Sequence, residues 1–287
     1  MGDSASPLLQ RRRLRTDLRT ARLEKELTQE QVAKAMDWSL SKMNRIEKAK
    51  TGISTNDLRA LLPLYGITDK KRTQELLDLA RASRQPGWWR QYSDFAPGRL
   101  LELIDFESAA SAVHQFETTV VPGILQTEEY ASAILQEFHG GNMPDENVRK
   151  LVELRTARRD LLVGVEAPKF SFVLDESVIH RVVGNPAVTS KQFRDLVSTA
   201  ELPSVTIQIV PFTAGLHPGM GGAFEVVEFD DTDDENIVYF EDRRGDFISD
   251  DPGEASGYLK AFHLIEEKSL APADSVALLR KAAAEMG

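Results

Sequence analysis

Cysteine is absent from this chain of 287 residues, aromatic residues make up only 7% of it, and no long hydrophobic run occurs. The lack of cysteine excludes disulfides, thiolate nucleophiles and cysteine-ligated zinc, and it fits a reducing cytoplasm. No apolar run approaches the roughly 18–20 residues that span a bilayer. The N-terminus, "MGDSASPLLQRRRLR", also lacks the apolar core of a signal peptide. We therefore expect a soluble, cytoplasmic protein with no membrane partner.

Positive net charge is lacking as well, since the formal net charge at pH 7 is -10. The charge is unevenly divided, however. Residues 1–85 hold 18 Lys and Arg against 11 Asp and Glu, a balance of +7, and the rest of the chain holds 17 against 34, a balance of −17. Because the Debye length at physiological salt is about 8 Å, acidic groups on another domain hardly weaken a basic face pressed on DNA. The first part of the chain therefore stays a candidate for binding DNA.

The length and a hydrophobic content of 41% predict two globular domains. Two Pro-Gly pairs in "RQPGWWRQYSDFAPG" interrupt the helical periodicity and indicate a boundary. We predict an all-α, five-helix, lambda-repressor-like helix-turn-helix domain over residues 1–85. An α+β domain is predicted over residues 86–287. Its predicted helices lie at 99–117, 145–162 and 190–202, and a turn followed by a helix is predicted over 120–138. Strands are predicted at 169–175, 205–212, 222–229 and 236–242, and a helical tail from about 254.

Within the first domain, an apolar stripe of Leu14, Leu18 and Ala21 predicts a first helix, preceded by the arginine-rich "QRRRLR". Thr28 and Gln31 have the spacing of a capping box for a second helix over 28–36, and Ser39 is a cap for a third over 39–48. The remaining helices are expected at 56–66 and 70–83. The spacing predicts that five residues converge between the second and third helices: Val32, Ala33, Met36, Met43 and Ile46.

The opposite face of the third helix has the spacing of a DNA-reading surface. Asn44 suits a bidentate contact with adenine, Ser41 suits several bases, and Leu40 suits a thymine methyl group. Phosphate contacts are predicted for Gln29, Lys42, Arg45, Lys48, Arg11, Arg12 and Arg13. The alternatives are a plain helical hairpin and, for the arginine run, a solvated face.

The segment "LTQEQVAKAMDWSLSKMNRIEKAK" resembles the XRE class of helix-turn-helix regulators. That resemblance implies a structural brace between an arginine late in the first helix and a glutamate that ends the third, here Arg22 and Glu47. Two positions depart from the class, because Asp37 stands where the turn often has glycine, and Ala49 replaces the glycine of a frequent Glu-x-Gly.

The second domain is similar to the C-terminal domain of unknown function in WhiJ-like actinobacterial regulators. The matching segments are "GWWRQYSDF", "FVLDESVIHRVVG" and "VTIQIVPFTAGLHPGMGGAFEVVEF". The resemblance implies a role in development and secondary metabolism. It also implies a small partner protein encoded nearby, in an arrangement likened to antitoxin and toxin.

The residues of this domain indicate little chemistry. Glu176 and His180 are four apart, as in a metal pair, but no second pair completes a site, and a capped helix start is preferred. "HPGMGG" lacks the Lys-Ser/Thr of a phosphate loop, and "DDTDDE" lacks the spacing of a calcium loop. We expect a mobile loop or hairpin connection for the first and a solvated turn for the second. No catalytic residue, metal or cofactor is therefore predicted.

Trp88, Trp89 and Tyr92, followed by Phe95, form the densest aromatic cluster. We favour a hydrophobic contact that joins the domains, with a ligand pocket or partner surface as the alternative. The sequence as a whole predicts a DNA-binding transcriptional regulator that is not an enzyme. It is expected to form a homodimer on double-stranded DNA and to respond to an unknown small ligand or a small protein. The alternative is an antitoxin-like protein whose DNA binding serves autoregulation.

Overall fold

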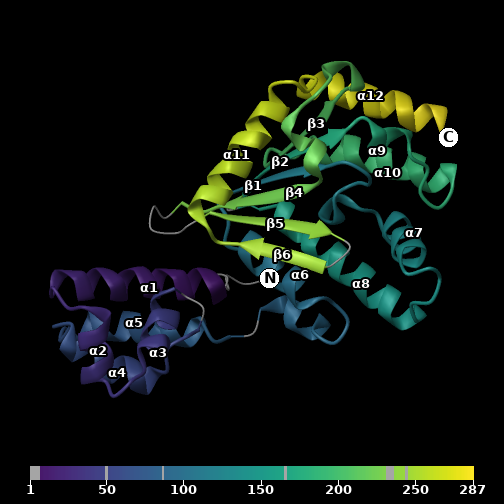
Figure 1. The fold of residues 1–287 in the computed structure, drawn as a ribbon. Coiled ribbons are helices and arrows are strands. Elements are labelled where there is room, and N and C mark those ends of the chain that lie inside the picture. Colours follow the sequence, from purple (N-terminus) through teal and green to yellow (C-terminus); the bar gives the residue numbers. More distant parts are fainter. Residues whose placement is uncertain (1–6, 49–50, 86, 165–166, 231–235, 243–244) are drawn as a thin grey trace. The chain divides into compact units, whose positions relative to one another are not determined.

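The computed structural model describes residues 7–48, 51–85, 87–164, 167–230, 236–242 and 245–287. The chain divides into two compact units, Met1–Trp88 and Trp89–Gly287, each with its own hydrophobic core. The first unit is all helical and the second combines helices with one six-stranded sheet (Figure 1). The predicted fold class, a helical helix-turn-helix domain followed by an α+β domain, is confirmed.

Five helices build the first unit: α1 (Pro7–Glu24), α2 (Gln29–Ala35), α3 (Leu40–Glu47), α4 (Thr55–Leu64) and α5 (Lys70–Ala82). The capping box at α2 forms as predicted, because the Thr28 hydroxyl accepts from the Gln31 backbone and the Gln31 side chain accepts from the Thr28 backbone. One expectation is corrected. The arginine run does not precede α1 but belongs to it, since Pro7 starts the helix and proline suits a first turn.

The first unit buries one core between all five helices. Val32, Met43 and Ile46 are at most 5% exposed and pack with Leu14 and Leu18 of α1. Met36, which was expected among the buried residues, is only partly buried and packs at the edge of this core. These apolar contacts therefore fix the angle between α2 and α3.

The sheet of the second unit has the strand order β3-β2-β1-β4-β5-β6. The strands are β1 (Ala112–Glu117), β2 (Lys169–Asp175), β3 (Val205–Val210), β4 (Phe224–Glu228), β5 (Ile237–Asp242) and β6 (Gly245–Ser249). The first three are parallel, and β4, β5 and β6 extend the sheet in antiparallel pairs from the other side of β1. This mixed topology places β1 at the middle of the sheet.

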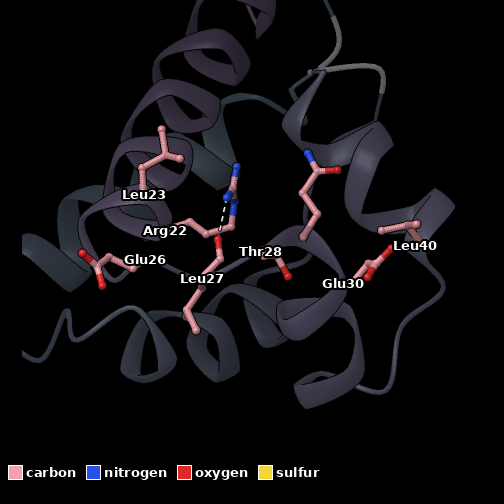
Figure 2. A pocket seen from close by; sticks show the side chains of 8 residues that line it. Arg22, Leu23, Glu26, Leu27, Thr28, Glu30 and Leu40 are labelled. Carbon is pink, nitrogen blue, oxygen red and sulfur yellow. Dashed lines mark hydrogen bonds between the residues drawn. The ribbon is translucent and has the colours of Figure 1, made fainter.

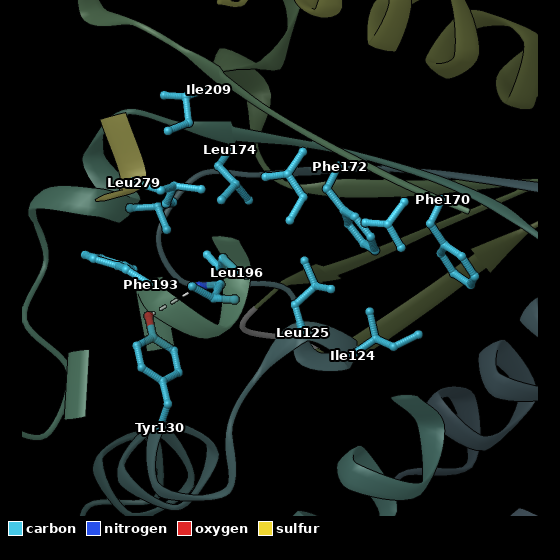
Figure 3. Close-up of a cluster of buried hydrophobic side chains, with 14 of the residues drawn as sticks. Ile124, Leu125, Tyr130, Phe170, Phe172, Leu174, Phe193, Leu196, Ile209 and Leu279 are labelled. Carbon is cyan, nitrogen blue, oxygen red and sulfur yellow. Dashed lines mark hydrogen bonds between the residues drawn. The ribbon is translucent and has the colours of Figure 1, made fainter. Parts of the chain in front are cut away.

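Helices cover both faces of the sheet. They are α6 (Gly98–Glu107), α7 (Glu128–Phe138), α8 (Asp145–Arg158), α9 (Ser177–His180), α10 (Pro186–Thr199), α11 (Pro252–Glu266) and α12 (Pro272–Glu285). The larger core lies between one face and residues of α6, α7, α9, α10 and α12, and Figure 3 shows Phe170, Phe172 and Leu196 within it. The smaller core lies on the other face, beneath Phe262 and Ile265 of α11.

Three expectations for the second unit are corrected. The segment 99–117 was predicted to be one helix, but only its first part is helical, as α6, and its last part is strand β1. Strand β1 is buried on both faces and therefore lacks the alternation of a half-exposed strand. Strand β6 was not predicted, and it pairs with β5 at the edge of the sheet. The helical tail is two helices, because the chain turns between α11 and α12.

Candidate nucleic-acid interface

Helix α3, the predicted recognition helix, presents its predicted reading face to solvent. Ser39 caps the helix, because its hydroxyl accepts from the Lys42 backbone at 3.1 Å. Leu40 is 46% exposed, Ser41 is exposed and Asn44 is half-buried, while the other side of the helix is buried in the core. The three side chains predicted to contact bases therefore share a face that is open to solvent. Their contacts with DNA stay a prediction.

The turn between α2 and α3 depends on a left-handed residue. Asp37 has a φ of 53°, the region that glycine adopts most easily and that aspartate tolerates better than most residues. Asp37 is the position at which the turn of the XRE class often has glycine. The turn thus keeps its geometry without glycine.

Arg22 and Glu47 form a buried ion pair that joins α1 to the end of α3. The Arg22 Nε donates to Glu47 Oε1 at 2.6 Å, and Nη2 donates to Oε2 at 3.0 Å. The hydrogen bonds with Glu47 raise the pKa of Arg22, against the desolvation that lowers it. A third bond, from Nη1 to the Leu27 carbonyl at 2.6 Å, fixes the segment before α2 (Figure 2). The structure therefore brings the two residues of the predicted brace together.

Gln29 lies at the first turn of α2, where a phosphate contact was predicted. In this structure its amide Nε2 donates to Glu47 Oε2 at 2.6 Å, so the side chain extends the brace to α2. A shallow groove opens beside it, lined by residues from the end of α1, the start of α2 and Leu40 of α3 (Figure 2). A phosphate contact by Gln29 stays a prediction, and the brace is the role that its contacts support directly.

The cations near α3 have different surroundings. Lys42 lies 4.1 Å from the Trp38 ring centroid and pairs with Asp57 at 3.1 Å, so it is engaged within the unit. Arg45 and Lys48 are exposed and have no ion-pair partner among the described residues. These two side chains suit phosphate contacts better than Lys42. The contacts of Lys42 with Trp38 and Asp57 could not be predicted from residue spacing, because both depend on the folded arrangement.

The three arginines of the run also differ. Arg13 is exposed, Arg11 is half-buried and donates to the Ser83 carbonyl at 3.3 Å, and Arg12 is 7% exposed. Consecutive residues of a helix point in different directions, so the three arginines cannot all lie on one face of α1. Of the three, Arg13 best suits a phosphate contact, which stays a prediction.

Among the described residues, the candidate motifs of the second unit are not brought together into a metal site. Glu176 precedes the short helix α9 and lies 3.3 Å from His180 within it, and the Asp175 carboxylate accepts a hydrogen bond from the Ser177 backbone at the start of the helix. "HPGMGG" forms a 3-10 turn before β4, and most of "DDTDDE" lies outside the described residues. Among the described residues, no three His, Asp or Glu side chains are placed to hold a metal ion.

The aromatic cluster begins at the boundary of the two units. Trp88 and Trp89 are half-buried and Tyr92 is 7% exposed, within a 3-10 helix over Trp88–Tyr92. Whether these residues form a ligand or partner surface stays a prediction.

The second unit contains a buried polar cluster that was not predicted from the sequence. Arg158 of α8 donates to both carboxylate oxygens of Glu107 on α6, at 2.6 and 2.5 Å, and lies 3.7 Å from Glu225 of β4. All three are at most 5% exposed. The available signal was a glutamate at an inward position of the apolar strand "FEVVE".

Two protein-family models match the chain. Residues 13–76 match a helix-turn-helix domain, and residues 100–281, more than half of the chain, match a domain of unknown function (DUF5753). No curated protein and no solved structure matches it. In the part of the chain that the structure describes, no helix is long and apolar enough to cross a membrane. A helix-turn-helix domain followed by a domain of unknown function is the order that the two sequence resemblances together predicted.

Proposed function

The chain belongs to the family defined by the domain of unknown function DUF5753, and with its helix-turn-helix domain as a second premise we propose that it is a sequence-specific transcriptional regulator. The helix-turn-helix domain suggests a DNA-binding regulator rather than an enzyme. We propose further that the protein acts in the cytoplasm as a homodimer on double-stranded DNA. From the WhiJ-like resemblance we propose a role in actinobacterial development.

The observation that carries this proposal is the contrast between the two faces of α3. Met43 and Ile46 lock one face into the core, and the Glu47 brace holds the end of the helix. The other face leaves Leu40, Ser41 and Asn44 accessible. A helix held this rigidly, with short side chains on its free face, suits insertion into the major groove. Two such helices in a dimer would read half-sites about one helical turn apart.

A DNA-binding assay over a salt series tests the proposal. The probe is the DNA upstream of the gene for this chain, with a scrambled duplex of equal length as control. We expect preferential binding, with an affinity that falls steeply as salt rises because several phosphate contacts release counterions. No preference for the upstream DNA, or an affinity that is flat in salt, contradicts the proposal.

A second candidate function rests on the negative charge of the second part of the chain. Residues 86–287 carry a balance of −17, which suits a basic partner. In this alternative the protein binds and neutralises a small partner protein, and DNA binding serves autoregulation. Purification of the tagged chain from its native host tests it, because the alternative requires a stoichiometric small protein that elutes with the chain. A regulator that responds to a small-molecule ligand does not require such a partner protein.

A further inference from the structure

The shallow groove of Figure 2 gathers the exposed apolar surface of the first unit. Its volume is about 610 Å³, and eight residues line it: Arg22, Leu23, Glu26, Leu27, Thr28, Gln29, Glu30 and Leu40. Leu23 is 55% exposed and Leu40 is 46% exposed, and they are the only large apolar side chains of the first unit that are so exposed among those that the structure describes. Leu27, which lies between them along the chain, is half-buried. Apolar contacts are therefore available to a molecule in this groove.

The same groove carries negative charge. Glu26 and Glu30 are exposed and have no ion-pair partner among the described residues. Arg22 is the only cation that lines the groove, and its charge is neutralised by Glu47 at 2.6 Å. Two uncompensated carboxylates therefore remain at the groove, within a domain whose charge balance over residues 1–85 is +7.

Neighbouring lysines do not neutralise these two carboxylates. The Lys25 ammonium lies against Gly66, where a Cβ would be 2.7 Å from its Nζ. Lys34 follows Glu30 by four residues, but it forms no ion pair with it in the part of the chain that the structure describes. The groove is therefore suited to a cation, because opposite charges attract and no other partner competes for these carboxylates.

The start of α2 does not make this groove a phosphate site. A helix start attracts anions, but Glu30 already places a carboxylate in the first turn, and the Thr28 hydroxyl accepts from the Gln31 backbone. The carboxylates of Glu26 and Glu30 also repel a phosphate. The DNA backbone is therefore a poor occupant for the inside of the groove.

The size of the groove favours a small molecule over a protein surface. Binding sites for small molecules occupy roughly 300–1,000 Å³, and the volume of this groove lies within that range. A stable protein interface covers roughly 800 Å² on each partner. Two exposed leucines with acidic residues beside them offer too little apolar surface for such an interface.

We propose that the groove binds a small organic cation with an apolar body. The apolar body packs on Leu23, Leu27 and Leu40. An ammonium or guanidinium group of the same molecule pairs with the carboxylates of Glu26 and Glu30. In Figure 2, Leu23 and Glu26 lie toward one end of the groove. Glu30 and Leu40 lie toward the other end, so a molecule that spans the groove covers Leu40.

Leu40 connects this site to the recognition of DNA. It lines the groove and also belongs to the face of α3 that we predict to contact bases. A ligand that covers Leu40 excludes a thymine methyl group from the same side chain, so the ligand lowers the fraction of protein that is competent to bind DNA. Binding of the cation does not depend on the proposed DNA binding, whereas this competition rests on it.

Calorimetric titration of the full chain tests the site. The probe is 4-phenylbutylamine, which has an apolar body and a primary ammonium group. Two controls each change one feature: 4-phenylbutyrate keeps the apolar body with the opposite charge, and putrescine keeps ammonium groups without the ring. We expect the probe to bind at one site per chain with at least about tenfold higher affinity than either control. Equal affinity for the probe and 4-phenylbutyrate, or no binding of the probe in the millimolar range, overturns the proposal.

Matched variants locate the binding. The double variant Glu26→Gln, Glu30→Gln removes both charges, and we expect it to lose about tenfold in affinity for the probe. Leu23→Gln should weaken binding through the lost apolar contact, whereas Glu137→Gln on the exposed end of α7 should bind as the wild type does. Unchanged affinity in both groove variants overturns the proposal. A lower molar mass of Leu23→Gln in light scattering also overturns it, because a second copy of the chain would then occupy the groove.

Competition with DNA tests the link to regulation. The upstream DNA is titrated with the chain at one salt concentration, with and without 4-phenylbutylamine at about ten times its Kd. We expect the apparent Kd for DNA to rise about tenfold. The double variant Glu26→Gln, Glu30→Gln should show a much smaller rise, which separates competition at the groove from screening of the DNA by the amine. Unchanged DNA affinity while the probe is bound overturns the competition. A wild type that binds no DNA contradicts the proposed function instead, and the calorimetric result for the groove stands.

Discussion

Asn44 and Arg45 are neighbours on α3, but their side chains lie in different surroundings. Asn44 belongs to the half-buried outward face, and Arg45 is exposed beside it. We expect Asn44→Ala to reduce discrimination between the operator and a mismatched duplex by about 1–3 kcal/mol. Arg45→Ala should weaken all sequences alike and lower the salt slope by about 1. Competition titrations with both duplexes measure the two effects, and equal discrimination by wild type and Asn44→Ala would exclude base contact by this residue.

The Arg22–Glu47 brace predicts a large effect on stability from one residue. Arg22→Met leaves the buried Glu47 carboxylate with Gln29 as its remaining side-chain donor. We expect a loss of about 3–5 kcal/mol in the free energy of unfolding, because the charge stays buried without compensation. The double variant Arg22→Met, Glu47→Leu should recover most of the loss. Urea unfolding of the three chains measures this, and a double variant no more stable than the single one contradicts it.

At the scale of elements, the turn between α2 and α3 is set by backbone geometry at Asp37. Left-handed geometry costs an L-residue roughly 1–2 kcal/mol, with less for aspartate. We expect Asp37→Gly to leave the free energy of unfolding within about 1 kcal/mol of the wild type, because relief of this strain is offset by backbone entropy. Asp37→Val, whose branched side chain resists a φ of 53°, should destabilise by more than about 1 kcal/mol. Thermal unfolding of both variants distinguishes them, and equal stability would place the turn outside the cooperative unit.

The sequence predicted the helices of the first unit well because their signals are local. The caps Thr28, Ser39 and the apolar spacing act within one or two turns of the chain. Strand β1 was missed because its identity depends on neighbours far along the chain, β2 on one side and β4 on the other. A strand buried on both faces has no alternation to read.

The same distinction applies to the candidate sites. Spacing alone placed Leu40, Ser41 and Asn44 on one face of α3, because a helix repeats every 3.6 residues. The engagement of Lys42 with Asp57 and of Gln29 with Glu47 could not be read from spacing, since it depends on how helices pack. The buried cluster around Glu225 depends in turn on strand register, which the sequence did not reveal.

At the scale of the whole molecule, some of the chain's many carboxyl groups are buried in the fold, and their pKa values are raised. Burial raises the pKa of Glu117 and Glu225. In the folded state these carboxyls stay protonated at pH values at which the same groups in the unfolded chain, with their ordinary pKa, have lost their protons. Glu129, whose pKa is lowered by its bond to Lys191, acts in the opposite direction, but only as the pH falls below about 4.5.

Stability should therefore decline as pH rises from about 5 to about 8. Between the ordinary pKa of 4.5 and its folded value of about 8, Glu117 binds a proton in the folded state and not in the unfolded one, so rising pH favours unfolding. We expect Glu117→Gln to match the wild type near pH 5 and to exceed its free energy of unfolding near pH 8. Chemical unfolding of the full chain at several pH values measures this, with Glu137→Gln as the exposed control. Parallel curves for wild type and Glu117→Gln would mean that solvent reaches Glu117 well enough to ionise it at its ordinary pKa.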